Sequence, residues 1–418
     1  MRLRGSAGAR RLWRRIALFM AILGPGVITA NVDNDAGGIT TYSQAGARYG
    51  FATLWLFIPL ALAVIVVQEM ANRMGVVSGK GLSDLIRERF GVKWTFYLML
   101  GLLVTNFGNI LAEFAGIAAA GEIFGVPRLI SVPLAALFVW FIVVRATYRT
   151  VEKVFLVAVI FYVSYILAGV LSRPAGGEVL QALTVPRFIP ESHYVIMLVA
   201  LIGTTIAPWM QFYQQAAVVE KNVRVDDYAL SRLDTILGGV SVSVVAAFIV
   251  IVCAINLHGR GVQIESAGDA ARALAPVAGR YAGGLFAFGL LNASMFAASI
   301  LPLSTAYTIC EGFGWESGVD KDFAAAPQFY VLFTALMATG AGLILLPGIS
   351  LIAVMYWSQV LNGFALPIVL VFMLMLINDR GIMGRHANSM WMNVVTIVLA
   401  AALSALGLAA AGLAVFGR

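Results

Sequence analysis

The sequence predicts an all-α membrane protein with many spanning helices, of which the first and the sixth are interrupted. Of its 418 residues, 61% are hydrophobic and only 12% are charged, and the mean hydropathy is +0.90. Soluble domains carry about 25% charged residues. Long apolar runs recur along the whole chain, and two of them contain residues that break helices. This composition excludes a soluble globular domain.

Eleven segments reach the length of about 20 mostly apolar residues that a spanning helix needs. The loops between them are short, and loop 259–280 is expected to hold a short surface helix around 266–274. We therefore expect one transmembrane domain over residues 1–418, with a first repeat of about 15–171, a second of about 193–377, and an extra helix at about 389–415. The predicted spans are 15–46, 51–73, 94–124, 128–147, 152–171, 193–219, 233–257, 281–312, 326–346, 349–377 and 389–415.

The first span is interrupted by the acidic stretch Asn31-Val32-Asp33-Asn34-Asp35-Ala36-Gly37-Gly38. A carboxylate at bilayer depth costs ~2.5–3.5 kcal/mol and is tolerated mainly where it faces a polar cavity. The glycines break the helix, and irregular backbone at this depth persists only where it lines a cavity. Carboxylates together with freed carbonyl oxygens in a broken membrane helix predict a cation site in a transporter.

The sixth span is interrupted at Ala207-Pro208, because proline removes one helical hydrogen bond and clashes with the preceding turn. Spans one and six hold corresponding positions in two halves of five helices each. Paired interrupted helices of this kind indicate an inverted-repeat transporter with its site near the middle of the membrane.

The distribution of basic residues predicts the orientation of the chain in a cell membrane. With the N-terminus in the cytoplasm, the inner side collects 20 of the 28 Lys and Arg residues and the outer side eight. Eleven spans then place the C-terminus outside. Because the basic residues are scattered over short loops, we expect no nucleic-acid partner.

Other classes of function find little support in the sequence. The two cysteines and three histidines show no metal-ligand spacing, and no nucleophile–base pattern indicates an enzyme. We expect a protein without a cofactor that is not an enzyme, is not cleaved as a secretory precursor, and functions as a monomer.

Several motifs resemble the NRAMP family of divalent-metal transporters over nearly the whole chain. The resemblance implies a LeuT-type fold of eleven or twelve helices, with the site at the breaks of helices one and six. The matching motifs are Gly24-Pro25-Gly26, Asp35-Ala36-Gly37-Gly38, Gln44-Ala45-Gly46-Ala47, Ala112-Glu113-Phe114, Ile202-Gly203-Thr204-Thr205-Ile206-Ala207-Pro208-Trp209 and Ser358-Gln359-Val360.

The departures from the family pattern concern its metal ligands and proton-carrying groups. Gly38 stands where the family has an asparagine ligand, and Ala207 stands where it has a methionine ligand. The family's two histidines of helix six correspond to Trp209 and Gln214, and an acid of helix three to Ile110. The arginines usual in span nine are also absent. This pattern is similar to the subgroup known as NRAMP-related magnesium transporters.

The resemblance and the ligand chemistry together predict a metal site at Asp35, Gly38, Thr204, Ala207 and Gln359. Asp35 would be the charged ligand and Thr204 would offer its carbonyl oxygen, whereas Gly38 and Ala207 would make room. Gln359, and less directly Asn362, would reach the ion or its water shell. Oxygen ligands suit Mg²⁺, which typically keeps several waters, and they also accept Mn²⁺.

Five further residues near the predicted site receive weaker roles. We expect Asp33 to be a charge in the vestibule rather than a ligand. Glu113, which the family links to proton movement, would here shape the electrostatic field of the cavity. We expect Trp209, Tyr213 and Trp357 to pack or gate rather than bind the ion.

The sequence favours uptake of Mg²⁺, and also of Mn²⁺, by alternating access without obligatory proton coupling. A proton-coupled importer of Mn²⁺ or other transition metals remains an alternative. An amino-acid or organic-cation symporter on the same fold is a further alternative, although Asp33 and Asp35 disfavour an anionic substrate.

Overall fold

The computed structural model describes Gly26, Thr29 and residues 32–145, 163–260, 264–272, 279, 282–319 and 321–416. Within these residues every regular element is a helix, and nine helical stretches are long and apolar enough to cross a membrane. Parts of the predicted spans 15–46 and 152–171 lie outside the described residues. The all-helical membrane architecture predicted from the sequence is confirmed.

The long helices and the halves of the broken ones follow the predicted spans closely. They are α3 (Ala36–Tyr49), α4 (Phe57–Ser78), α6 (Val92–Ile123), α7 (Arg128–Arg145), α9 (Val163–Leu171), α11 (Ser192–Thr205), α12 (Pro208–Glu220), α13 (Tyr228–Asn256), α16 (Ala282–Phe313), α17 (Pro327–Ile344), α18 (Leu351–Ile377) and α20 (Met390–Phe416).

Short helices occupy several of the predicted loops, and one of them, η1, lies at the start of the predicted span 51–73. The expected surface helix is present as α14, whereas the others had no length or periodicity signal that set them apart from loop sequence. They are η1 (Gly50–Leu56), α5 (Leu82–Phe90), α10 (Gly176–Thr184), η3 (Val225–Asp227), η4 (His258–Arg260), α14 (Ala267–Ala271), α19 (Arg380–Met383) and η7 (Gly384–His386).

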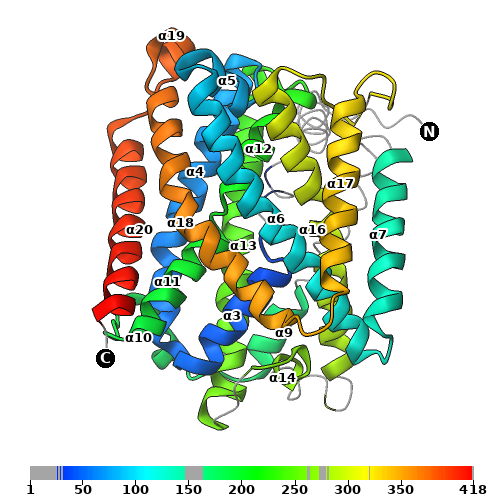
Figure 1. Cartoon of the computed structure of the whole chain (residues 1–418). Coiled ribbons are helices and arrows are strands. Elements are labelled where there is room, and N and C mark those ends of the chain that lie inside the picture. The colour runs from blue at the N-terminus through cyan, green and yellow to red at the C-terminus, as the bar shows by residue number, and fades with distance from the viewer. Residues whose placement is uncertain are drawn as a thin grey trace, which may run out of the picture.

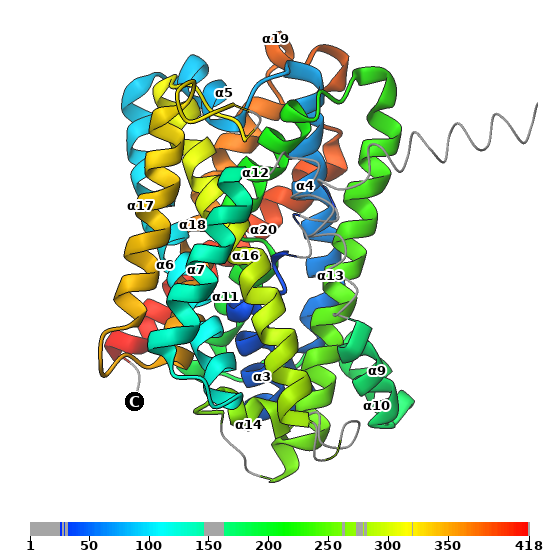
Figure 2. The ribbon, with the colours of Figure 1, turned by 90° about the vertical axis from the view of Figure 1, so that its right-hand side faces the viewer.

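The broken helices lie in the middle of the bundle and other helices surround them. Figures 1 and 2 show α3 between its neighbours in both views, whereas α20 and α7 lie at opposite edges of Figure 1. In the most apolar 18 residues of each stretch, 94% are buried in α11–α12 but only 17% in α20. The rim helices therefore present their apolar side chains to lipid, and the central helices carry the polar residues.

The two ends of the bundle separate the loops as the distribution of basic residues predicts. The short helices α5 and α19 lie at one end, and α10 and α14 lie at the other (Figures 1 and 2). The connection between α12 and α13, which contains Lys221 and Arg224, lies at the end with α5 and α19. Three of the loops predicted to lie on the inner side, namely those with α5 and α19 and the α12–α13 connection, thus share one end of the described structure.

Buried amide pairs fix α6 against its neighbours next to the broken helices. The side chains of Asn109 and Asn362 exchange two hydrogen bonds of 3.0 and 2.9 Å between α6 and α18. Asn106, one turn earlier, donates to Thr305 Oγ1 on α16 across 3.0 Å. Paired polar groups in an apolar interior specify the register of neighbouring helices, because each would be costly to bury alone.

Candidate metal site at the two helix breaks

Asp35 caps the helix that follows the first break. The residue is extended (φ −71°, ψ −171°), α3 begins directly after it, and its Oδ1 accepts a hydrogen bond of 2.6 Å from Gly38 N. Asparagine, aspartate and serine are the preferred residues at this position, because their oxygen satisfies a free N–H of the first turn. The positive end of α3 also stabilises the carboxylate at this depth. The local sequence thus explains why the chain holds this acid in place.

Three oxygen atoms closely approach Gly38. A Cβ built on Gly38 would lie 2.4 Å from the carbonyl oxygen of Asp33, 3.2 Å from Thr204 Oγ1 and 3.4 Å from Asp35 Oδ1. Even a Cβ at this position would force the Asp33 carbonyl to move, so glycine is required for the close approach of the main chain. That Gly38 makes room for an ion stays a prediction. The structure brings Asp35 and Thr204 together at this glycine.

The second break separates α11 from α12 at Ile206 and Ala207. Helix α11 ends at Thr205, Ala207 is extended (φ −70°, ψ 143°), and Pro208 begins α12. The residue four positions after Thr204 is Pro208, which has no N–H, so the Thr204 carbonyl has no helical donor. The predicted interruption is confirmed at the predicted position.

Two features of the second break were not foreseen from the sequence. The Thr204 hydroxyl lies beside Gly38 and has no hydrogen-bond partner among the described residues, so Thr204 offers a side-chain oxygen as well as its carbonyl. The sulfur of Met210 lies 3.3 Å from Ala207 N and accepts its hydrogen bond. A thioether therefore lies close to this break, although Ala207 itself has none.

Gln359 of α18 contacts the first turn of α3. A Cβ built on Gly37 would lie only 1.9 Å from Gln359 Nε2, so the amide group packs directly on the main chain there. Gln359 Nε2 donates to Ser358 Oγ, and its Oε1 accepts from Asn362 Nδ2, both across 3.0 Å. The Oε1 atom keeps one further lone pair. Gln359 therefore lies beside the break, and Asn362 orients it.

Glu113 joins α6 to the first break. Its Oε2 accepts from Ala36 N across 3.3 Å, and its carboxyl group lies within hydrogen-bonding reach of the Asp35 carboxyl. Its Oε1 has no partner, and Glu113 has no ion pair, within the described part of the chain. Two carboxyl groups this close favour a shared proton or a bound cation.

Asp33 differs from its expected role as a vestibule charge. The residue is 2% exposed, and its Oδ2 has no hydrogen-bond partner among residues with a described placement. It lies in the turn before α3 rather than on a regular helix. Helical spacing therefore does not set the direction of Asp33 relative to Asp35, because the chain is not helical between them.

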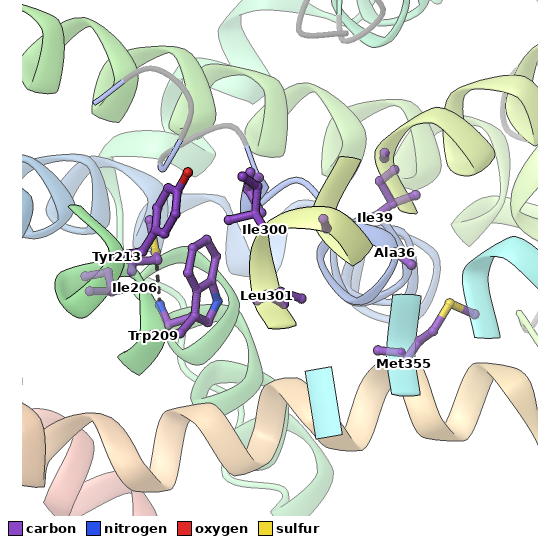
Figure 3. Packing of buried hydrophobic residues seen from close by; sticks show 14 of the residues in the cluster. Ala36, Ile39, Ile206, Trp209, Tyr213, Ile300, Leu301 and Met355 are labelled. Atoms are coloured by element: carbon purple, nitrogen blue, oxygen red, sulfur yellow. Dashed lines mark hydrogen bonds between the residues drawn. The ribbon is translucent and has the colours of Figure 1, made fainter. Parts of the chain in front are cut away.

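The aromatic residues near the break are placed differently from one another. Figure 3 shows Trp209 and Tyr213 of α12 side by side, close to Ile206 of the break, and their ring centroids are 6.3 Å apart. Both residues are buried, in agreement with a packing role. Trp357 is instead 55% exposed and lines a cavity of about 640 Å³ together with Arg48, His193 and His258. Trp357 therefore belongs to a vestibule.

The residues that replace titratable family positions are also buried. Gln214 is fully buried, and neither end of its amide has a partner in the described structure. Ile110 packs against Gly340 of α17. Within the described ranges no group of three or more His, Cys, Asp and Glu could hold a metal ion. A metal at the breaks would therefore depend on neutral oxygens in addition to Asp35.

Two interrupted helices at the centre of an all-helical membrane bundle are the architecture of the LeuT-type fold. The chain belongs to the Nramp family, because the profile described as natural resistance-associated macrophage protein-like matches residues 26–411. It is similar to the divalent metal cation transporter MntH of Deinococcus radiodurans, with 30% identity over 97% of this chain and 91% of that protein. The divalent metal cation transporter MntH 1 of Pseudomonas aeruginosa is 29% identical over 94% of this chain and 91% of its own length.

Solved structures support the same fold. The manganese transporter of Eremococcus coleocola superimposes with a TM-score of 0.80 at 22% identity, over 95% of this chain and 86% of that chain. The nucleobase-cation-symport-1 family transporter Mhp1 superimposes with a TM-score of 0.57 at 15% identity, over 93% of both chains. The fold expected from the resemblance is therefore confirmed, as is membership of the family.

Proposed function

We propose that this protein moves divalent metal cations across the membrane by alternating access, with Mg²⁺ as the preferred ion and Mn²⁺ as a second substrate. The observation that carries the proposal is the group of oxygen atoms around Gly38, namely Asp35 Oδ1, Thr204 Oγ1 and the Asp33 carbonyl. The names of the MntH relatives, which are divalent metal cation transporters, support the substrate class.

The donor set favours a hard ion. Carboxylate, hydroxyl and carbonyl oxygens suit Mg²⁺ and Mn²⁺, whereas a thioether favours softer transition metals. Mg²⁺ loses its waters reluctantly and is usually held by one or two carboxylates. Asp35 supplies the charge, and Thr204 and Gln359 supply neutral oxygens. Gly38 and Ala207 add no ligand side chain, so waters would complete the coordination of the ion.

We further propose that transport needs no obligatory proton partner. Trp209, Gln214 and Ile110 do not titrate, so the groups that carry protons elsewhere in the family are replaced. The membrane potential supplies the driving force, since two charges crossing 100 mV are worth about 4.6 kcal/mol. At ~1.4 kcal/mol per tenfold ratio, this sustains accumulation on the order of a thousandfold.

Two observations favour a second candidate, a proton-coupled Mn²⁺ importer. Glu113 lies within hydrogen-bonding reach of Asp35, and the Met210 sulfur lies 3.3 Å from Ala207 N. Glu113 could carry a proton. The Met210 sulfur could bind a soft metal if its hydrogen bond with Ala207 N were broken. The structural relative from Eremococcus coleocola is named a manganese transporter.

The proposed location is the cell membrane, with a monomeric chain whose N-terminus is cytoplasmic and whose C-terminus is outside. The shared end of the basic loops supports this sidedness. Single cysteines at Arg224 and at Arg187, labelled in intact cells with an impermeant maleimide, test it. Only the cysteine at position 187 should react. Labelling confined to position 224 would show that the orientation is the opposite of the proposed one.

The metal preference is tested by uptake into proteoliposomes with a panel of Mg²⁺, Mn²⁺, Cd²⁺ and Ca²⁺. The Asp35→Asn variant is the control for flux through the proposed site. We expect Mg²⁺ and Mn²⁺ to enter and each to compete with the other. Flux of Cd²⁺ with no response to excess Mg²⁺ would contradict the proposal.

A further inference from the structure

A second polar cavity lies far from the helix breaks, at the end of the bundle that carries α5 and α19. Its volume is about 280 Å³, and it lies where α4, the start of α13 and the connection from α19 to α20 meet. We call it the arginine pocket. Its polar and aromatic lining includes Glu69, Arg73, Arg232, Arg385, His386 and Trp391.

One arginine of the pocket, Arg73, binds the segment that forms the wall of the pocket. Arg73 forms an ion pair of 3.1 Å with Glu69 and donates to the His386 carbonyl across 3.1 Å. It also donates to Asn388 Oδ1 across 2.5 Å. These contacts hold the connection before α20 against α4, because Arg73 is almost fully buried and both of its terminal NH₂ groups bond to that connection. Its Nε has no partner in the described part of the chain.

The other two arginines have no charge partner. Arg232 and Arg385 are exposed, and neither forms an ion pair in the part of the chain that the structure describes. Arg385 uses only its Nε, which lies 3.4 Å from His386 Nε2. Both terminal NH₂ groups of the Arg385 guanidinium are thus able to bind a ligand. With Glu69 neutralised by Arg73, the pocket has an excess of two positive charges.

The start of α20 adds to this positive potential. Ser389, directly before α20, and residues 391 and 392 of its first turn line the pocket, and the turn contains no acidic residue. The free N–H groups of a helix N-terminus favour an anion. Trp391 is 51% exposed and Met390 is 84% exposed, so the same turn presents large apolar side chains outward. Tryptophan is enriched where a membrane protein meets the headgroup region.

We propose that the arginine pocket binds a phosphate group, and in the first place the phosphodiester headgroup of an anionic lipid. Arginine forks bind phosphate oxygens in pairs, and basic pockets between membrane helices suit such headgroups. A water occupies about 30 Å³, so the cavity holds roughly nine, which is enough for a phosphate and its glycerol. The exposed apolar turn of α20 would lie along the acyl chains.

The test compares two charge-matched double variants of the full-length protein. Arg232→Gln with Arg385→Gln empties the pocket of its free cations. Arg224→Gln with Arg380→Gln removes two exposed arginines from the same end of the molecule without touching the pocket. Cardiolipin, phosphatidylglycerol and phosphatidylcholine are titrated into detergent-purified protein, and bound lipid is counted by native mass spectrometry.

We expect the wild-type protein and the matched control to retain cardiolipin and phosphatidylglycerol equally. The pocket variant should bind them at least about tenfold more weakly, as loss of charge-assisted hydrogen bonds implies. Equal binding by the two double variants, or equal retention of phosphatidylcholine by the wild type, would overturn the proposal. Inorganic phosphate is the final arm: full displacement of the lipid by low phosphate concentrations would identify the ligand as soluble phosphate, and failure to displace it would identify the lipid.

Discussion

The main-chain nitrogen of Ala36 donates to Oε2 of Glu113 across 3.3 Å, so a carboxyl group on α6 holds the first residue of α3. This contact connects the break of the first helix to a helix that spans the membrane without interruption. It also places the Glu113 carboxyl beside that of Asp35, which caps the same helix end.

The Glu113 contact predicts a difference between two substitutions of similar size. Glu113→Gln keeps an oxygen that can accept from Ala36 N, whereas Glu113→Leu leaves that N–H without a partner. Loss of one partner from a buried hydrogen-bonded pair lowers the free energy of unfolding by ~1–3 kcal/mol. Thermal unfolding in detergent should therefore place the leucine variant below the glutamine variant. Equal unfolding temperatures would show that the contact does not contribute to stability.

Asp35 has two roles that substitution can separate. Asp35→Asn keeps the cap on α3 but removes the charge, and Asp35→Ala removes both. We expect both variants to lose Mg²⁺ and Mn²⁺ flux on the order of 100-fold or more, since even partners outside the ligand shell are worth 10–100-fold. Only the alanine variant should also lose ~0.5–2 kcal/mol of stability. Normal flux in a folded Asp35→Asn protein would remove Asp35 from the metal site.

Ala207 is the position at which a soft ligand can be restored. Ala207→Met should raise uptake of Cd²⁺ relative to Mg²⁺ by roughly tenfold, because a thioether favours the softer ion. Ala207→Leu adds similar bulk without sulfur and is the matched control. If both variants change selectivity equally, the effect is steric. The companion change Gly38→Asn is less informative, since a Cβ there would lie 2.4 Å from the Asp33 carbonyl.

The packing of Gln359 on Gly37 predicts coupling between these two residues. Gly37→Ala places a methyl group where Gln359 Nε2 lies, 1.9 Å away, and overpacking of this kind costs ~1–3 kcal/mol. Adding Gln359→Ala should relieve that strain, so the double variant should be more stable than the sum of the single effects implies. Gly342→Ala, in open space on α17, is the control glycine. Strict additivity in thermal unfolding would contradict the contact.

Much of the fold could be predicted because its signals are local. Apolar runs of membrane length predicted the spans, and Pro208 predicted the second break at the position where the structure has it. The short helices α5 and α10 were missed, because elements of nine residues in polar connections carry no length signal. Parts of the predicted spans 15–46 and 152–171 stay predictions, since they lie outside the described residues.

The candidate site was predictable in composition but not in geometry. Asp35 and Thr204 could be chosen because each lies at a helix break. The contacts of Gly38 with Thr204, and of Gly37 with Gln359, join residues far apart in the chain and depend on how the helices pack. The position of the Met210 sulfur could not be predicted, because its contact with Ala207 N depends on the side-chain conformation of a residue three positions further on. The assignment of metal ligands itself stays a prediction.

The central claim is Mg²⁺ transport without obligatory proton movement, and one measurement tests it most directly. Mg²⁺ uptake is followed in proteoliposomes that contain a pH-sensitive dye, at a fixed membrane potential and with or without a proton ionophore. We predict Mg²⁺ entry that grows with the inside-negative potential and leaves the internal pH unchanged. Internal acidification in fixed proportion to Mg²⁺ entry, absent without the metal, would contradict the account and would indicate Glu113 or Asp33 as the proton carrier.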